Sequence, residues 1–244
     1  MNFNLKEKFL NSIEKADRIT VITGAGVSAE SGVPTFRGKD GLWKNYSPEE
    51  LATPQAFERN PALVWEWYNW RRELISKCNP NPAHIFLKNL ENEKKDGFLL
   101  ITQNVDGLHR KAGNKRIIEI HGCLWRVRCV KCGNKFYNYD VPIKILPRCE
   151  KCGNILRPDV VWFGESLNYE DLKKSISACI NCDVLLVIGT SGIVQPVASF
   201  PFQAKRENSN VFLIDINPSK NRISEIADLY IPEKAGEFLK NFIK

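Results

Sequence analysis

Long apolar runs are missing from this chain, and so are several other features that mark particular classes of protein. No run approaches the roughly 20 consecutive apolar residues that a membrane-spanning helix needs. Residues 1–8 contain no signal-peptide core and instead predict the start of an amphipathic helix. No internal repeat, low-complexity tract or flexible linker is present. We therefore expect a cytoplasmic globular protein without a membrane partner.

A concentrated block of positive charge is also missing. The formal net charge of +7 comes mainly from scattered lysines, whereas nucleic-acid binding favours a basic stripe on one face. A direct nucleic-acid ligand is therefore not expected. With 244 residues, 43% of them hydrophobic, the chain can form one large core, or a core with a subsidiary module.

The cysteines favour a metal site over disulfides, because an intracellular chain is kept reduced. Four of the eight form a C-x2-C…C-x2-C pattern, and each pair is followed by Gly-Asn, the tight turn of a zinc knuckle: Cys129, Cys132, Cys149 and Cys152. Four thiolates complete a tetrahedron around Zn²⁺ and leave no open position for water. The sequence therefore predicts one structural zinc.

A glycine-rich turn follows the apolar run 19–23, which predicts a buried strand. Gly24, Gly26 and Ala29 fit the G-x-G-x-x-G/A pattern, which lets the backbone approach a pyrophosphate. Such turns also occur for packing alone. No strand pattern precedes Asp40 or Glu49, so the ribose carboxylate of a dehydrogenase, expected about 20 residues on, is missing. This favours a dinucleotide site of another kind.

Four further apolar runs, at 98–102, 117–120, 184–188 and 211–216, predict buried strands that end in polar or small residues. Helical stretches separate most of them, which indicates an α/β fold with a doubly wound parallel sheet. Ligands of such folds bind outside the carboxyl ends of the strands. We therefore expect one shared crevice there.

Two insertions interrupt this pattern. Residues 39–82 hold most of the tryptophans and predict helices, and residues 123–158 hold the zinc knuckles. We expect both to form a smaller zinc-binding domain facing the crevice. The remaining segments, 1–38, 83–122 and 159–244, would form the larger, Rossmann-like domain.

Taken in order, the motifs resemble those of the sirtuins, which are NAD-dependent protein lysine deacylases. They are residues 24–37 (GAGVSAESGVPTFR), residues 102–109 (TQNVDGLH), His121-Gly122, the four zinc cysteines, Gly189-Thr190-Ser191 and Asn217. The resemblance covers residues 18 to 236. It implies a Rossmann-like domain, a small zinc domain, and NAD consumed as a co-substrate.

In such enzymes the acyl-lysine oxygen attacks the ribose C1′ as nicotinamide leaves, and the acyl group ends on ADP-ribose. His121 matches the histidine base, a role that suits the pKa of imidazole. The other two histidines, His84 and His109, are interpreted as structural. The positions that match or adjoin the family's NAD site are Gly24, Ala25, Gly26, Ala29, Phe36, Arg37, Gln103, Asn104, Asp106, Gly189, Thr190, Ser191, Asn217 and Ala235.

Two segments match sites for the acylated protein. The segment 160–165, with Val160, Phe163 and Gly164, resembles the part that pairs with a peptide by strand addition.

The second segment concerns the acyl group. Tyr68 and Arg71 are three residues apart on a predicted helix, so both project from one face and can bind a carboxylate. Together with the small Ala52 they resemble class III sirtuins, which prefer succinyl- and malonyl-lysine; acetyl-lysine is expected as a further substrate. The structural alternative is that the aromatic residues of this helix pack in the small domain while Arg71 and Arg72 lie in solvent.

Other functions remain open at this point. A mono-ADP-ribosyltransferase could use the same NAD site and would label protein without an acylated peptide. A zinc-ribbon nucleic-acid-binding module would account for the charge and the cysteines, but it leaves the glycine turn, residues 103–106 and His121 unexplained. A dehydrogenase is disfavoured by the missing ribose carboxylate.

Overall fold

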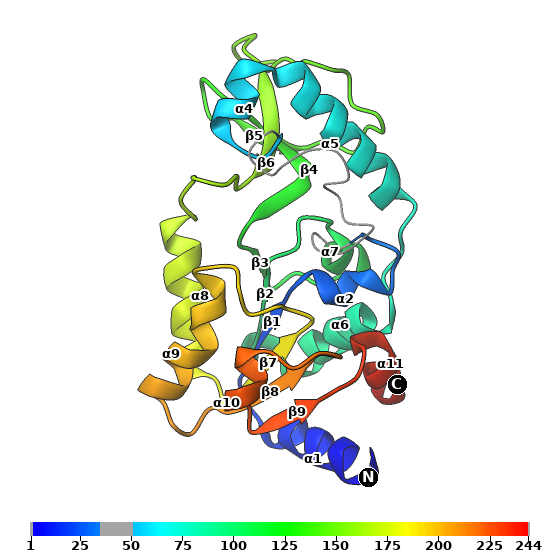
Figure 1. Cartoon of the computed structure of the whole chain (residues 1–244), viewed down its shortest axis with the longest axis vertical. Helices are drawn as coiled ribbons and strands as arrows, with labels where there is room; N and C mark the ends of the chain where they lie inside the picture. Colours follow the sequence, from blue (N-terminus) through cyan, green and yellow to red (C-terminus); the bar gives the residue numbers. More distant parts are fainter. Residues whose placement is uncertain (1, 35–50, 244) are drawn as a thin grey trace.

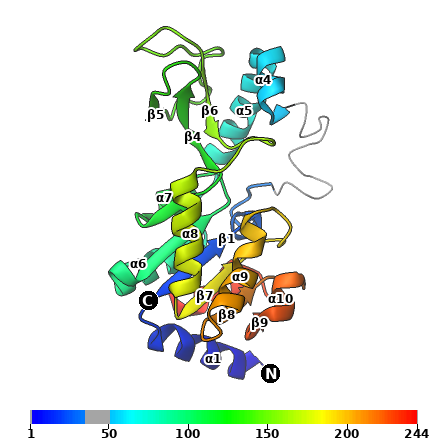
Figure 2. The ribbon, with the colours of Figure 1, turned by 90° about the vertical axis from the view of Figure 1, so that its left-hand side faces the viewer.

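The chain folds into two lobes, each built around its own sheet (Figures 1 and 2). The computed structural model describes residues 2–34 and 51–243. The lower lobe in Figure 1 holds a six-stranded sheet and the upper lobe a three-stranded one. None of the helices in the two described ranges is long and apolar enough to cross a membrane.

All neighbouring strands of the large sheet run parallel, in the order β3-β2-β1-β7-β8-β9. The strands are β1 (Ile19–Thr23), β2 (Phe98–Thr102), β3 (Ile117–Glu119), β7 (Val184–Ile188), β8 (Phe212–Ile216) and β9 (Leu229–Ile231). The order reverses between β1 and β7, the switch point at which doubly wound sheets bind ligands. Because Thr23 pairs with both Thr102 and Ile188, three strands end at one level.

Helices cover both faces of this sheet (Figure 2). Side chains alternate between the faces, so Val21 joins the core under one helix layer and Ile22 the core under the other. The first layer contains α1 (Asn2–Lys15), α6 (Pro82–Lys94) and α11 (Ala235–Leu239). The second contains α8 (Tyr169–Asn181), α9 (Phe200–Glu207) and α10 (Arg222–Ile226). Burial on both faces explains the continuous apolar runs of these strands.

Short helical segments complete the large lobe: α2 (Ala25–Ala29) and α7 (Leu108–Ala112), and the 3-10 turns η1 (Lys95–Gly97), η2 (Val197–Ser199) and η3 (Lys240–Phe242).

Within the described residues, the small lobe packs two helices against an antiparallel sheet of order β5-β4-β6. Its strands are β4 (Gly122–Cys129), β5 (Lys135–Tyr137) and β6 (Leu156–Val160), and its helices are α4 (Pro54–Arg59) and α5 (Pro61–Ser76). Helix α5 begins where Asn60 Oδ1 accepts the Leu63 N–H at 3.1 Å. The fully buried Trp65 then donates Nε1 to the Leu156 carbonyl oxygen at 2.9 Å, which fastens α5 to β6.

The α/β fold with a Rossmann-like sheet and a smaller zinc-knuckle lobe was expected from the sequence and is confirmed. The small sheet runs from Gly122 to Val160, slightly beyond the predicted module at 123–158. Within the predicted insertion 39–82, the described part contains α4 and α5. The domain boundaries themselves stay a prediction.

His84 and His109 lie in the large-lobe interior with their rings 4.6 Å apart. His84 Nδ1 accepts the Asn81 N–H at 3.2 Å and so closes the first turn of α6. His109 Nε2 lies 3.1 Å from Thr23 Oγ1. Burial lowers the pKa of His84 to about 4, and burial together with His84 lowers that of His109. Both imidazoles are therefore held neutral in the folded chain, as suits the structural role predicted for them.

Acid should destabilise the fold through His84. Between its ordinary pKa of 6.5 and its folded pKa of about 4, the unfolded chain binds a proton that the folded chain does not. The free energy of unfolding must therefore fall as the pH falls through this window, by about 3 kcal/mol at most. His84→Gln cannot titrate, so urea unfolding at pH 7.5 and 4.5 should show a shallower pH dependence for the variant. Burial raises the pKa of Asp215 to about 6, so protonation of Asp215 stabilises the fold as the pH falls. This opposite effect is the same in the wild type and in His84→Gln. An identical dependence in both would contradict the assignment.

Candidate active site

A cavity of about 1660 Å³ lies between the two lobes, at the carboxyl ends of β1 and β7. It exceeds the ~300–1,000 Å³ of ordinary small-molecule sites, so it can hold a dinucleotide together with part of a second substrate. Most of the residues predicted for the site line it: Gly24, Ala25, Gly26, Ala29, Ala52, Tyr68, Arg71, Gln103, Asn104, His121, Val160, Phe163, Gly164, Gly189, Thr190, Ser191, Asn217 and Ala235.

The floor of the cavity is a close contact between the turns that follow β1 and β7. The Gly26 N–H donates to the Gly189 carbonyl oxygen at 2.8 Å. A Cβ on Gly26 would lie 2.8 Å from Gly189 Cα, and a Cβ on Gly24 would lie 2.8 Å from Thr190 Cα. These glycines are therefore required by the packing of two backbones, whatever else they contact. The sequence pattern had offered packing as the alternative to pyrophosphate binding, and both can hold.

Side chains from the other strand ends fasten these two turns. Asn104 Nδ2 donates to the Gly24 carbonyl oxygen at 3.0 Å and to Ser28 Oγ at 3.1 Å. Gln103 Nε2 donates to Thr190 Oγ1 at 3.1 Å. With its amide nitrogen engaged in this way, Asn104 offers its carbonyl oxygen to a ligand.

The Thr190 turn has a further support at its other side. Asn217 Nδ2 donates to the Thr190 carbonyl oxygen at 2.7 Å. Four strand ends thus meet at one rigid floor, because β1, β2, β7 and β8 all deliver a residue to it.

His121 stands at the junction of β3 and β4, half-buried in the cavity wall. Its Nδ1 lies 3.1 Å from the Gln103 carbonyl oxygen. Because a carbonyl can only accept, Nδ1 carries the hydrogen, and the neutral ring keeps its lone pair on Nε2. Burial lowers the pKa of His121, and the bond to Gln103 only partly opposes this. The imidazole is therefore a neutral base at pH 7.

The residue after this histidine has to be glycine. Gly122 has φ +84°, and a Cβ there would collide with the carbonyl oxygen of Asp159. Val161, just beyond β6, donates its N–H to the His121 carbonyl oxygen at 2.9 Å. The backbone on both sides of His121 is thereby fixed.

The small-lobe end of the cavity is formed by helix α5 and the segment after β6. Tyr68 and Arg71 are both buried there. The Tyr68 hydroxyl oxygen accepts Trp162 Nε1–H at 2.8 Å, so its own hydrogen remains available to a ligand. The Arg71 guanidinium lies 4.8 Å from the ring centre of Trp67 and 5.5 Å from that of Tyr68.

Burial raises the pKa of Tyr68, and the positive charge of Arg71 opposes the rise. Burial likewise lowers the pKa of Arg71, opposed by Tyr68 and Asp106. The sequence alternative that placed Arg71 and Arg72 in solvent is wrong, because both are buried. Arg72 serves the fold: it donates Nη1 to the Leu124 carbonyl oxygen at 3.0 Å and Nη2 to Asn138 Oδ1 at 2.7 Å.

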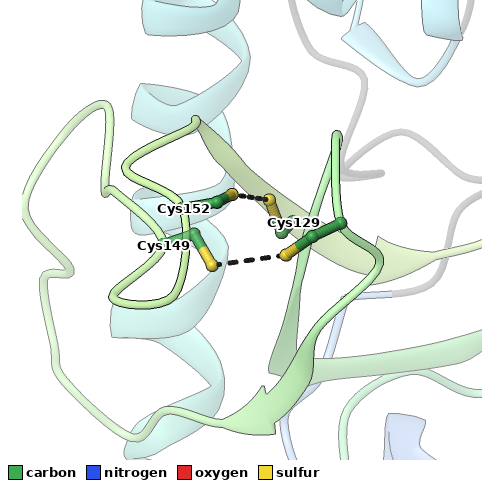
Figure 3. A group of neighbouring side chains, drawn as sticks. Cys129, Cys149 and Cys152 are labelled. Carbon is green, nitrogen blue, oxygen red and sulfur yellow. Dashed lines mark hydrogen bonds between the residues drawn. The ribbon is translucent and has the colours of Figure 1, made fainter.

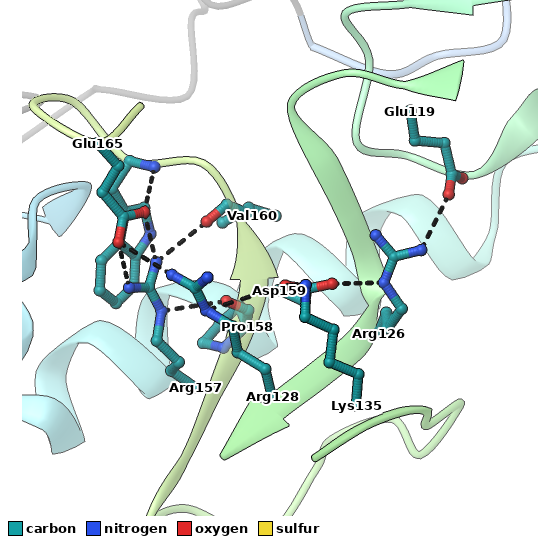
Figure 4. A network of polar contacts seen from close by, with 10 residues as sticks. Glu119, Arg126, Arg128, Lys135, Arg157, Pro158, Asp159, Val160 and Glu165 are labelled. Atoms are coloured by element: carbon teal, nitrogen blue, oxygen red, sulfur yellow. Dashed lines mark hydrogen bonds and ion pairs between the residues drawn. The ribbon is translucent and has the colours of Figure 1, made fainter. Parts of the chain in front are cut away.

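A polar network holds the segment after β6 in place (Figure 4). Glu165 Oε1 accepts Arg157 Nη1 at 2.6 Å and Arg128 Nη2 at 2.9 Å. Its Oε2 accepts the Trp162 N–H at 2.9 Å. Burial tends to raise the pKa of Glu165, but the bonds from Arg157 and Trp162 outweigh it and lower that pKa. The ionised carboxylate therefore sets the turn that carries Trp162 and Phe163.

The network extends to the end of β3, next to His121. Asp159 pairs with Arg126 and with Lys135, whose Nζ lies 3.1 Å from Asp159 Oδ1. Arg126 also reaches Glu119, two residues before His121, at 3.4 Å, where the Glu119 side chain is 4% exposed. One chain of charges thus links the β3 end to the β4–β6 pair.

The four zinc-knuckle cysteines converge at the far end of the small lobe (Figure 3). Their four Sγ atoms all lie within 4.8 Å of one another. Cys129 and Cys152 are separated by 3.4 Å, and Cys132 and Cys149 by 3.7 Å. A tetrahedron with Zn–S bonds of ~2.3 Å has edges of about 3.8 Å, so these sulfurs fit a zinc ion. The set has no water position, which makes the zinc structural.

Known proteins share this arrangement. The pattern of the Sir2 family matches residues 24–196. A protein of Aquifex aeolicus (strain VF5) named NAD-dependent protein deacylase is 55% identical over 223 residues, which are 91% of this chain and 92% of that protein. The chain belongs to the Sir2 family.

Solved Sir2 structures agree with this membership. One Sir2 homologue in complex with NAD superposes with a TM-score of 0.89 at 47% identity, covering 97% of this chain and 92% of that one. A mutant Sir2 homologue in complex with 2′-O-acetyl ADP-ribose gives a TM-score of 0.88 at 47% identity, covering 97% and 94%. The resemblance to sirtuins drawn from the motifs is confirmed.

Three further residues were predicted for the Sir2 cofactor site, and only one of them lies among the described residues. Phe36 and Arg37 lie outside the described residues. Asp106 is buried beside the cavity but does not line it. Its Oδ1 accepts the Leu108 N–H at 2.8 Å, and burial raises its pKa against this bond, a bond to Ser28 and the charge of Arg71. In this structure Asp106 therefore affects the cofactor site through Leu108, Ser28 and Arg71, and not by lining the cavity.

The motifs also missed part of the Sir2 cavity. The additional lining residues come from helices and loops between the strand ends, and include Trp67, Tyr169, Ile193, Val194, Lys220 and Lys234. Lys220 lies four residues beyond β8, so its nearness to a strand end was the available signal. Lys234 likewise follows β9, and Ile193 and Val194 follow β7. Trp67 comes from α5 of the small lobe, so its approach depends on how the two lobes pack.

Glu30 also lines the cavity, and its Oε2 accepts the N–H of Gly236 at 2.7 Å. The contact fastens α2 to α11.

Loss of the metal should loosen the small lobe. Cys152→Ser removes one exposed ligand, so the zinc content should fall below one per chain and the melting temperature should drop by about 5–10 °C. Cys78→Ser, at a buried thiol outside the cluster, is the matched control and should keep the zinc. Metal analysis and thermal melting, each with and without a chelator, check this. Unchanged melting after zinc removal would refute a structural role.

Proposed function

We propose that this chain is an NAD-dependent protein lysine deacylase that prefers succinyl- and malonyl-lysine, also accepts acetyl-lysine, and yields nicotinamide and O-acyl-ADP-ribose. The enzyme class rests on membership of the Sir2 family and on relatives named NAD-dependent protein deacylase. The acyl preference rests on one observation: Tyr68 and Arg71 are buried side by side at the small-lobe end of the cavity that His121 lines. Those residues make this the class III type of sirtuin.

The residues present fit the cofactor. A floor made of backbone turns, with Gln103, Asn104 and Asn217 around it, is the kind of surface that a dinucleotide requires. NAD, when bound, supplies a sugar carbon that becomes electrophilic as nicotinamide leaves. The chain supplies the base: His121 Nε2 is unprotonated and can take the proton of a sugar hydroxyl while Nδ1–H stays on the Gln103 carbonyl.

The acyl end of the cavity favours a substrate that ends in a carboxylate. The Arg71 guanidinium can donate two parallel hydrogen bonds to it, and the Tyr68 hydroxyl a third. A neutral acetyl group cannot accept these charge-assisted hydrogen bonds, so it gains less binding free energy than a carboxylate does. The negative charge of Asp106, which acts to raise the pKa of Arg71, partly compensates the positive charge of Arg71 when the substrate carries no carboxylate. Acetyl-lysine should therefore be a poorer substrate but still a substrate.

The peptide itself is expected along residues 160–165. Much of this segment's donor capacity is already used: the Trp162 N–H donates to Glu165, and the Phe163 N–H to the Ala52 carbonyl oxygen. The Val160 and Trp162 carbonyl oxygens also accept hydrogen bonds, from Arg157 Nη2 and from the Glu165 N–H. Strand addition would have to use other carbonyl groups of the segment and the N–H of Gly164. The exposed Phe163 ring would then lie against the peptide.

His121→Ala should abolish deacylation without unfolding the chain. A general base contributes roughly 100- to 10,000-fold, so kcat should fall by that factor for every acyl group. In the wild type, the midpoint of the decline of kcat with falling pH should lie below 6.5, the ordinary pKa of imidazole, because burial lowers the pKa of His121 and the neutral ring is the active form. His84→Gln is the control and should keep its activity at pH 7.5. Near-normal turnover by His121→Ala would refute the role of the base.

Arg71→Met should separate the acyl groups. Hydrogen bonds to charged groups are worth about 1.5–3 kcal/mol, so kcat/KM for succinyl-lysine peptide should fall roughly 10- to 100-fold. For acetyl-lysine peptide the change should stay within about three-fold, because no carboxylate is lost. Glu66→Gln, at an exposed position on the same helix, should change neither. Equal losses with both peptides would reject the carboxylate preference and leave deacylation itself standing.

A further inference from the structure

A second cavity, of about 410 Å³, lies behind the wall that carries the candidate active-site residues. The same chain segments contribute to both cavities with residues a few positions apart. Asn104 lines the large cavity and Asp106 the second one; His121 lines the large cavity and Cys123 the second. The second cavity is therefore separate from the proposed deacylase site, yet built on the same backbone.

Exposed apolar side chains gather at these two places. Among the described residues, Phe163, Tyr169, Ile193 and Val194 are large, exposed and line the large cavity. Three others line the second cavity in the same way: Tyr137, Tyr139 and Val141. Tyr139 is 68% exposed, which is costly for an aromatic ring unless something covers it. Exposed apolar side chains thus line the second cavity as they line the candidate active site.

The aromatic rings of the second cavity are arranged nearly parallel. Tyr137 and Tyr139 have ring centres 5.9 Å apart and planes 7° apart, and Trp125 and Tyr139 have centres 6.1 Å apart and planes 26° apart. Trp125 is held rigidly, since its Nε1 donates to the Asp106 carbonyl oxygen at 2.7 Å and Arg72 lies 5.0 Å from its ring centre. Fixed parallel ring faces favour a flat ring as the ligand, because no side chain has to be ordered on binding.

The charges around the rings favour an acidic group. Arg110 and Lys111 line the cavity together with one carboxyl group, that of Asp106. Arg110 pairs through Nε with Glu119 Oε1 at 3.1 Å, which leaves the far edge of its guanidinium toward solvent, where the side chain is 37% exposed. The Asp106 carboxyl group already accepts the Leu108 N–H. The Lys111 ammonium also donates to the Cys78 carbonyl oxygen at 2.7 Å. Two cationic side chains beside flat rings still suit an aromatic acid.

We propose that the second cavity is a binding site for a planar aromatic carboxylate. The ring lies against Tyr139 and Trp125, and the carboxylate lies beside Arg110 and Lys111. A ligand held there would lie beside Asp106, which lines the cavity and whose carbonyl oxygen accepts Trp125 Nε1–H.

Calorimetric titration of the whole chain with 2-naphthoate tests this site, with the neutral 2-naphthamide as the matched ligand. Tyr139→Ala should weaken 2-naphthoate binding roughly ten-fold, the upper range for one stacking partner. Arg110→Gln should weaken 2-naphthoate by a similar factor and leave 2-naphthamide unchanged. Tyr169→Ala, which removes an equally exposed tyrosine from the large cavity, should bind 2-naphthoate like the wild type.

Tyr139 is exposed, so Tyr139→Ala should not unfold the chain, and weaker binding would not be due to loss of folding. Melting curves of the variant check this. The site is overturned if the wild type does not bind 2-naphthoate, or if Tyr139→Ala binds it as tightly as the wild type does. Equal weakening by Tyr169→Ala and Tyr139→Ala would also overturn it, since binding would then follow exposed tyrosines in general.

Discussion

The contact between the Gly26 and Gly189 backbones is the constraint on which the rest of the structure depends. It joins the turns after β1 and β7 at the point where the strand order reverses, and no side chain fits between them. Gln103, Asn104 and Asn217 then attach to these turns by hydrogen bonds. A dinucleotide would therefore meet a surface that is rigid before binding, which saves the cost of ordering it.

The two lobes divide the chemistry. The large lobe holds the glycine turns of the cavity floor and, just after β3, His121, the base in the proposed reaction. The small lobe holds Tyr68 and Arg71 on α5, the proposed acyl-selecting pair, and its four-cysteine cluster belongs to the lobe whose sheet α5 packs against. The ion pairs from Glu119 through Arg126 to Asp159 connect the end of β3 to the β4–β6 pair of the small lobe (Figure 4).

The sequence predicted the central strands well, because β1, β2 and β7 are five-residue apolar runs that end in small or polar residues. It missed β9, whose three residues carry no periodic pattern, and the small sheet, where arginines interrupt β4. Helical spacing placed Tyr68 and Arg71 together correctly. It could not reveal that Arg72 is buried, because the partners of Arg72 lie more than fifty residues away. Asp106 was expected beside Asn104 in the cavity, but the two residues face different cavities.

Product analysis by mass tests the central claim most directly, that the cavity transfers a carboxylate-bearing acyl group from lysine to the sugar of NAD. The chain would be incubated with NAD and a succinyl-lysine peptide, and every product weighed. The account predicts equal amounts of nicotinamide, unmodified lysine peptide and O-succinyl-ADP-ribose. Nicotinamide release with ADP-ribose attached to protein, or with the succinyl group still on the peptide, would contradict it.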